Sequence, residues 1–213
     1  LGSNGIIMTS PDGITWTRST SFMTTTLNEV NWTGAQYVAV GASGTLLTSY
    51  DGKKFTTQMT GTTNNLYGVA WSGSMLATVG NSGTILTSQN GTSWSPQTSG
   101  TSSSLNGVAW SGTQFVVVGD SGTIFTSQNG TSWSPQTSGT SSNLNGVAWS
   151  GSILATVGNS GTILTSQNGT SWTSQTSGTT SNLLYISWSG TKFVSLVEGG
   201  TVITSPDGVT WTP

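Results

Sequence analysis

The sequence predicts an all-β fold, a β-propeller of four-stranded antiparallel blades, and three observations support it. A seven-residue segment recurs six times along the 213 residues, always at an interval of 39. Turn signals separate short apolar stretches within each interval, and a period near 40 with such turns is typical of propellers and solenoids. Apolar residues never recur at helical spacing, so we expect essentially no helix.

The recurring segment reads SQNGTSW in three identical copies and SPDGITW, SYDGKKF and SPDGVTW in three looser ones. The copies begin at positions 10, 49, 88, 127, 166 and 205. Asn-Gly and Asp-Gly pairs are strong tight-turn signals, because both residues tolerate a positive φ. The predicted turn residues are Ser10, Asp12, Gly13, Trp16, Ser49, Asp51, Gly52, Ser88, Asn90, Gly91, Trp94, Ser127, Asn129, Gly130, Trp133, Ser166, Asn168, Gly169, Trp172, Ser205, Asp207, Gly208 and Trp211.

One unit, from Leu105 to about Gln136, shows the expected strands in order. The first strand reads LNGVAWSG, and the chain turns at its final Ser-Gly pair. The second strand reads QFVVVGD and the third reads TIFTS. TSWSPQT is a fourth, edge strand, because Pro135 cannot donate a hydrogen bond to a further strand. Four strands in hairpin succession form a meander, which is one propeller blade.

The apolar pattern of the strands favours blades that stack around an axis. Val116, Val117 and Val118 place apolar side chains on both faces of the second strand, as in strands covered on both sides. Gly107 and Ala109 give the first strand small residues, which suit crowding near the axis. The alternative is a β-solenoid with 39-residue coils, but such coils usually contain shorter internal repeats, and none is found.

We expect one domain over residues 1–213, with repeat units at about 27–57, 66–96, 105–135, 144–174 and 183–213. Five units of 39 residues leave 18 over, and these match a hairpin at 1–18. If the ring has five blades, this hairpin is left over. If the ring has six blades, the chain is two strands short of completing it. We expect five complete blades plus the surplus hairpin, in a chain that is processed or a fragment because it begins at Leu1.

Composition excludes several classes of function. The chain has no His and no Cys, so it cannot hold a Ser-His-Asp or Cys-His relay, a zinc finger or an iron–sulfur cluster, and we expect no metal and no cofactor. Its only bases are Arg18, Lys53, Lys54 and Lys192, too few for a nucleic-acid-binding stripe. No apolar run approaches the roughly 18 residues of a membrane span. The low charge and the abundance of Ser and Thr are typical of extracellular, cell-surface or virion proteins.

The segment SxDGxTW resembles the Asp-box of sialidases and other propellers, in a form one residue shorter than usual. It is most similar to the repeats of photosystem II assembly factor-type propellers, and the resemblance covers nearly the whole chain. It implies that the box is structural, with the Asp or Asn side chain accepting backbone N–H bonds and the Trp packing into the blade. Phe55 replaces the Trp in one copy.

The resemblance to sialidases does not extend to their activity. That family uses three arginines, a Tyr nucleophile and a Glu, and this chain has one arginine. A generic glycosidase needs two carboxylates, for which Glu29 and Glu198 are the candidates. Both lie in terminal repeats. Sequence drift of terminal repeats and the need for a few charges to keep the protein soluble explain these two residues better than catalysis does, so we expect no catalytic residue and no enzyme.

A second tryptophan series ends the first strand of each unit and comprises Trp32, Trp71, Trp110, Trp149 and Trp188. These side chains suit the blade core, or alternatively stacking platforms for sugars. Three functional hypotheses follow. The first is a non-catalytic scaffold with a protein partner or self-assembly, the second a multivalent glycan-binding propeller, and the third an assembly-factor-like chaperone.

Overall fold

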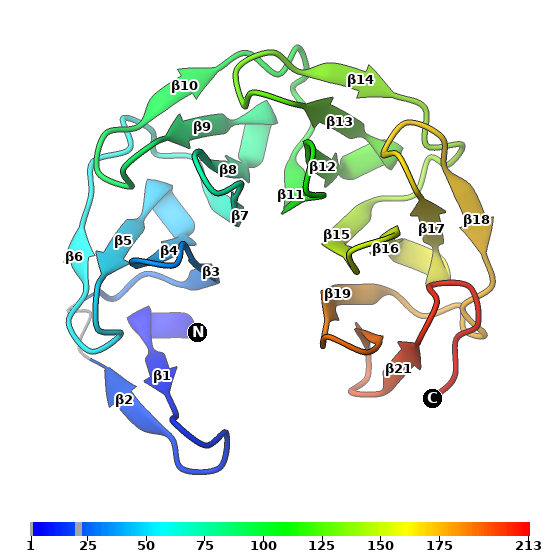
Figure 1. Ribbon diagram of the computed structural model, residues 1–213, viewed down its shortest axis with the longest axis horizontal. Helices are drawn as coiled ribbons and strands as arrows, with labels where there is room; N and C mark the ends of the chain where they lie inside the picture. The colour runs from blue at the N-terminus through cyan, green and yellow to red at the C-terminus, as the bar shows by residue number, and fades with distance from the viewer. Residues whose placement is uncertain (1, 20–22) are drawn as a thin grey trace.

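A computed structural model describes residues 2–19 and 23–213 and shows five blades that follow one another along an open arc (Figure 1). Leu1, the first residue of the predicted hairpin, lies outside the described residues. The all-β prediction is confirmed, since helical structure in the described residues is limited to five three-residue 3-10 turns. None of these helices has the length and apolarity that crossing a bilayer requires.

The strands of the blades have the following bounds. Blade 1 contains β3 (Leu27–Trp32), β4 (Tyr37–Gly41), β5 (Leu46–Ser49) and β6 (Thr56–Thr57); blade 2 contains β7 (Leu66–Trp71), β8 (Leu76–Gly80), β9 (Ile85–Ser88) and β10 (Ser95–Gln97). Blade 3 contains β11 (Leu105–Trp110), β12 (Phe115–Gly119), β13 (Ile124–Ser127) and β14 (Ser134–Gln136); blade 4 contains β15 (Leu144–Trp149), β16 (Leu154–Gly158), β17 (Ile163–Ser166) and β18 (Thr173–Gln175). Blade 5 contains β19 (Leu183–Trp188), β20 (Phe193–Val197) and β21 (Val202–Ser205).

Every complete blade is an antiparallel meander, as the sequence predicts. In blade 3 the order is β11-β12-β13-β14, and Pro135 lies in the edge strand β14 opposite Phe125. The edge strands are shorter than expected, because the turn before each one holds the residues up to the tryptophan. In blade 5 the fourth strand is reduced to a single bridge between Thr204 and Thr212.

The surplus hairpin forms a separate two-stranded sheet of β1 (Ile7–Thr9) and β2 (Thr17–Ser19). Its strands correspond, 39 residues earlier, to β5 and β6, the outer half of blade 1. The hairpin therefore forms the outer half of a further blade, beside blade 1 (Figure 1).

The core lies between the blades rather than within one. Five buried apolar clusters occur among the described residues, one at each junction between consecutive sheets. The junction of blades 2 and 3, for example, packs Val79 and Ile85 against Leu105, Phe115 and Val117. Stacking of neighbours is therefore the main source of stability, as in other repeat proteins.

The inner strands approach one another closely around the axis. β3 contacts β7, β7 contacts β11, β11 contacts β15 and β15 contacts β19. A Cβ added at Gly107 would lie 3.1 Å from the Cα of Gly146, so glycine permits this approach. Comparable packing between β19 and β3 is not found in the described part of the chain. The two end blades are therefore not the packed neighbours that a closed five-bladed ring would make them.

Candidate functional site

The recurring turn is held by its own side chains. In the third copy Asn90 Oδ1 accepts the backbone N–H groups of Thr92 and Ser93, both at 2.9 Å. Ser88 Oγ accepts the Gly91 N–H at 2.9 Å, and the Trp94 indole donates to the Gly91 carbonyl at 3.0 Å. Each bond lies inside the turn, so these groups shape the chain and offer little to a ligand.

Aspartate makes the same contacts in the looser copies. Asp12 Oδ1 accepts N–H groups from Ile14 and Thr15, and Asp207 Oδ1 accepts them from Val209 and Thr210. The backbone donors lower the pKa of Asp12 to about 2, and backbone donors also lower the pKa of Asp51 and Asp207. Asp and Asn are therefore equivalent in geometry but not in their response to pH.

The box tryptophans lie at the blade junctions and do not meet at one site. Trp94, Trp133 and Trp172 are half-buried against apolar clusters, and Trp211 is 9% exposed. Trp16, in the N-terminal hairpin, is 56% exposed, and it belongs to none of the apolar clusters of the described residues.

The second tryptophan series has a mixed environment. Trp71, Trp110, Trp149 and Trp188 are half-buried and pack against the clusters, whereas Trp32 is 47% exposed. Trp110 meets Phe115 edge-on at 4.8 Å between ring centroids. Trp71, Trp110 and Trp149 also line an axial cavity of about 300 Å³. The series thus combines inter-blade packing with partial access from the axis.

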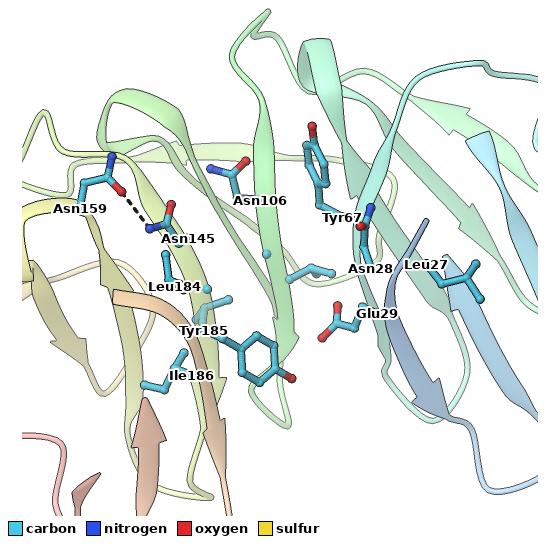
Figure 2. A pocket seen from close by; sticks show the side chains of 14 residues that line it. Leu27, Asn28, Glu29, Tyr67, Asn106, Asn145, Asn159, Leu184, Tyr185 and Ile186 are labelled. Carbon is cyan, nitrogen blue, oxygen red and sulfur yellow. Dashed lines mark hydrogen bonds between the residues drawn. The ribbon is translucent and has the colours of Figure 1, made fainter. Parts of the chain in front are cut away.

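A larger cavity, of about 490 Å³, lies on the axis between the inner strands (Figure 2). It adjoins the smaller cavity, and Glu29 and Tyr185 line both. The polar side chains that line it are Asn28, Glu29, Tyr67, Asn106, Asn145, Asn159 and Tyr185, and Leu27, Leu184 and Ile186 are among the apolar ones.

The asparagines reach this cavity through a bulge that every inner strand contains. In β11 the pairing with β12 shifts between Leu105 and Gly107, which leaves Asn106 without a partner in the ladder. Asn106 Nδ2 then donates to the Leu144 carbonyl of the next blade at 3.0 Å and to Asp120 Oδ1 at 2.9 Å. Asn145 makes the corresponding bonds one blade later. The Oδ1 atom of Asn106 accepts no hydrogen bond from the described residues.

Glu29 and Tyr185 occupy one repeat position, which Gly68, Gly107 and Gly146 fill in the middle blades. In Figure 2 their side chains lie on facing sides of the cavity. Glu29 Oε2 accepts the Val69 N–H at 2.7 Å. Burial raises the pKa of Glu29 to about 7, although the hydrogen bond from the Val69 N–H acts in the opposite direction and lowers it. Burial, and then the charge of Glu29, raises the pKa of the Tyr185 hydroxyl.

The second carboxylate considered for catalysis lies elsewhere. Glu198 follows β20, is exposed, and accepts a hydrogen bond from Asn182 Nδ2 at 2.8 Å. It does not line the cavity that contains Glu29. Within residues 2–19 and 23–213 no group of three or more acidic residues that could hold a metal ion is found.

The sequence drew attention to Glu29 only as a carboxylate that drift and solubility explain, and Tyr67 and Tyr185 were missed. Both depart from the repeat, since Tyr67 stands where Asn28, Asn106 and Asn145 stand in other inner strands. Alignment of each position across the five units would have found them.

Comparisons with known proteins show the fold. No family model matches the chain, and no curated protein matches it. The structure described as "YCF48 bound to D1 peptide" matches with a TM-score of 0.70 and 18% identity, over 89% of this chain and 66% of that one. This chain thus spans just under two thirds of that protein. YCF48 from Cyanidioschyzon merolae gives a TM-score of 0.73 at 17% identity, over 99% of this chain and 78% of that one.

A chain of a nidogen/laminin complex matches with a TM-score of 0.68 and 12% identity, over 90% of this chain and 80% of that one. The predicted similarity to photosystem II assembly factor-type propellers is confirmed at the level of fold. The likeness to sialidase propellers stays a prediction.

Proposed function

We propose that this chain is a non-catalytic binding scaffold whose axial cavity holds an extended segment of a partner polypeptide. The observation that carries the proposal is the cavity of about 490 Å³ between the inner strands. Sites that bind small segments are concave, largely apolar and equipped with a few convergent polar groups.

The chemistry of the lining fits a peptide. No hydrogen bond to the hydroxyls of Tyr67 and Tyr185, or to Asn106 Oδ1, is made by the described residues. These groups can therefore bond the N–H and C=O groups of a bound backbone. Leu184 and Ile186 supply apolar contact beside them. Glu29 is the carboxylate that lines the cavity, so a Lys or Arg side chain in the segment fits best.

Proteins of similar fold bind polypeptides. One structural neighbour is described in complex with a D1 peptide and another in a complex with laminin. Those partners belong to those proteins, and they support the proposal of a polypeptide partner for this chain. We also propose an extracellular, cell-surface or virion location, on the basis of the low charge, which fractionation of the source cells would test.

A peptide selection tests the proposal. A library of displayed random peptides is selected on the immobilised chain, and the recovered peptides are measured against Glu29→Gln, Tyr185→Ala and, as a matched control, Tyr50→Ala. Tyr50 is 77% exposed and lies in an outer turn. We expect peptides rich in Lys or Arg, with affinity lowered at least about tenfold by the two cavity variants and unchanged by the control. Equal binding to all variants would contradict the proposal.

Glycan binding is the second candidate, and one observation favours it. Trp71, Trp110 and Trp149 line the smaller axial cavity together. A glycan array followed by a fluorescence titration separates the two candidates. A sugar bound in this cavity should quench tryptophan fluorescence, and a Trp110→Phe variant should bind the sugar more weakly. A chaperone role remains the third candidate and predicts binding to partly folded client proteins.

A further inference from the structure

The two axial cavities share part of their lining. Glu29 and Tyr185 line both the cavity of about 490 Å³ and the smaller one of about 300 Å³. Trp71, Trp110 and Trp149 line the smaller cavity but not the larger one. A long side chain that enters from the larger cavity and reaches Glu29 therefore meets the tryptophan-lined cavity with its tip.

The carboxylate of Glu29 is not paired with a cation of the described chain. Its Oε2 atom accepts the Val69 N–H at 2.7 Å, and its Oε1 atom accepts no hydrogen bond from the described residues. Glu29 is also the one charged side chain among the described residues that line either cavity. Carboxylates withdrawn from water in proteins are usually paired with a cation or carry a proton. Burial raises the pKa of Glu29 accordingly, so a cationic ligand would satisfy this carboxylate.

Glycines leave space beside this carboxylate. Glu29 stands at a repeat position that Gly68, Gly107 and Gly146 fill in the middle blades. A Cβ added at Gly68 would lie 3.3 Å from Glu29 Oε2, and Gly107 and Gly146 line the larger cavity. A planar group can therefore approach the carboxylate from the side of the middle blades.

The tryptophans supply aromatic surface that is already held in place. Trp110 packs edge-on against Phe115, with 4.8 Å between ring centroids. Trp71 and Trp149 pack against the apolar clusters at their own junctions. Side chains that are ordered before a ligand arrives lose less entropy on binding, so these rings suit a group that stacks on them.

A carboxylate combined with aromatic rings favours a guanidinium group over an ammonium group. A guanidinium is planar, stacks on aromatic rings and matches a carboxylate with two parallel hydrogen bonds. Among aromatic side chains, tryptophan attracts cations most strongly. A lysine ammonium is compact and strongly hydrated, so it gains less from the indoles and has more water to lose on entry.

We propose that Glu29 and these three tryptophans form a specificity site that selects arginine over lysine in the bound segment. The guanidinium pairs with Glu29 where the two cavities adjoin, and it stacks on an indole of Trp71, Trp110 or Trp149. This selectivity rests on the proposed function, because it identifies the side chain by which the axial cavity recognises a polypeptide.

Three peptide pools test the selectivity on the full chain. Each pool has the form X-X-X-Z-X-X-X, where X is an equimolar mixture of alanine, serine, leucine and valine. Z is arginine, lysine or citrulline, which has nearly the shape of arginine but no charge. Fluorescence polarisation of the labelled pools gives one affinity for each. We expect the arginine pool to bind at least about tenfold more tightly than either of the other two.

Variants locate the selectivity, with the ratio of affinities between pools as the readout. Trp71→Leu, Trp110→Leu and Trp149→Leu each remove one indole, and at least one of them should lower the ratio of arginine to lysine to about threefold or less. Glu29→Gln should lower the ratio of arginine to citrulline similarly, because the charge pair is lost. Trp172→Leu is the matched control, since Trp172 is half-buried at a blade junction but lines neither cavity, and it should leave both ratios unchanged. Circular dichroism confirms that each variant is folded.

The outcomes separate this selectivity from the proposed function. Equal affinity for the arginine and lysine pools, with binding weakened by Tyr185→Ala, overturns the selectivity but supports the proposed function. Ratios unchanged in Glu29→Gln and in all three variants of the axial tryptophans overturn the selectivity as well. Absence of binding by every pool overturns both.

Discussion

The middle blades and the end blades have nearly the same sequence pattern but different environments. The second strand is buried at all five residues in blades 2, 3 and 4. In blade 5 the same strand is exposed at Leu196, at 46%, and partly exposed at Val194. The difference arises because a blade covers its neighbour rather than itself, so position in the array decides burial. The end blades consequently keep apolar side chains exposed that their counterparts in the middle blades bury.

The largest expected effect comes from truncating the side chain at the same repeat position in blade 4 and in blade 5. Ile163 is fully buried, whereas its equivalent Val202 is 39% exposed. Ile163→Ala should lower the free energy of unfolding by about 2–5 kcal/mol because it leaves a cavity. Val202→Ala should cost less than about 1 kcal/mol. Urea unfolding measures both, and similar losses would break the comparison.

Glycines with positive φ separate the turns that contact the segment linking two blades from the turns that face solvent. Gly122 has φ of 69°, and a Cβ there would lie 2.7 Å from Ser138 Oγ and closer still to the Thr140 carbonyl oxygen. Gly122→Ala should cost roughly 2–4 kcal/mol. Gly139 has φ of 77° and open space around it, so Gly139→Ala should cost about 1 kcal/mol. Equal costs in thermal unfolding would show that backbone strain alone, without the contact to the linking segment, explains both.

Glu29 distinguishes the first blade from the middle blades in its response to pH. Its pKa rises from 4.5 to about 7 on folding, so the folded protein keeps a proton that the unfolded chain releases between these values. The free energy of unfolding should therefore fall as pH rises from about 4.5 to about 7. Glu29→Gln should remove this slope. A slope unchanged in the variant would assign the pH dependence to another group.

The smallest effect concerns the turn of the N-terminal hairpin. The pKa of Asp12 is lowered to about 2, so its stabilising bonds are present at neutral pH and are lost as pH falls from about 4 toward 2. Asp12→Asn should keep the hairpin folded through this range, because Asn90 and its equivalents hold the same turn. Nuclear magnetic resonance of the hairpin amides follows the transition, and loss of the hairpin in both proteins at the same pH would contradict this assignment.

Much of the fold could be predicted because the same turn motif occurs six times at a constant interval. The Asn-Gly and Asp-Gly turns mark strand ends, and Pro135 marks an edge strand that the structure places at an edge. The open arc could not be predicted, because the angle between blades depends on packing across the five junctions and not on any local pattern. The cavity was missed for a related reason. Tyr185 and Glu29 are far apart in the sequence, and only the stacking of four junctions brings them to one axis.

Hydrogen exchange measured by mass spectrometry on the free chain tests most directly whether position in the array sets stability. We predict slow exchange in β8, β12 and β16 and faster exchange in the equivalent strand β20 and in the β1–β2 hairpin. Exchange that follows sequence alone, with β20 as protected as β12 and β1 as protected as β9, would contradict the account.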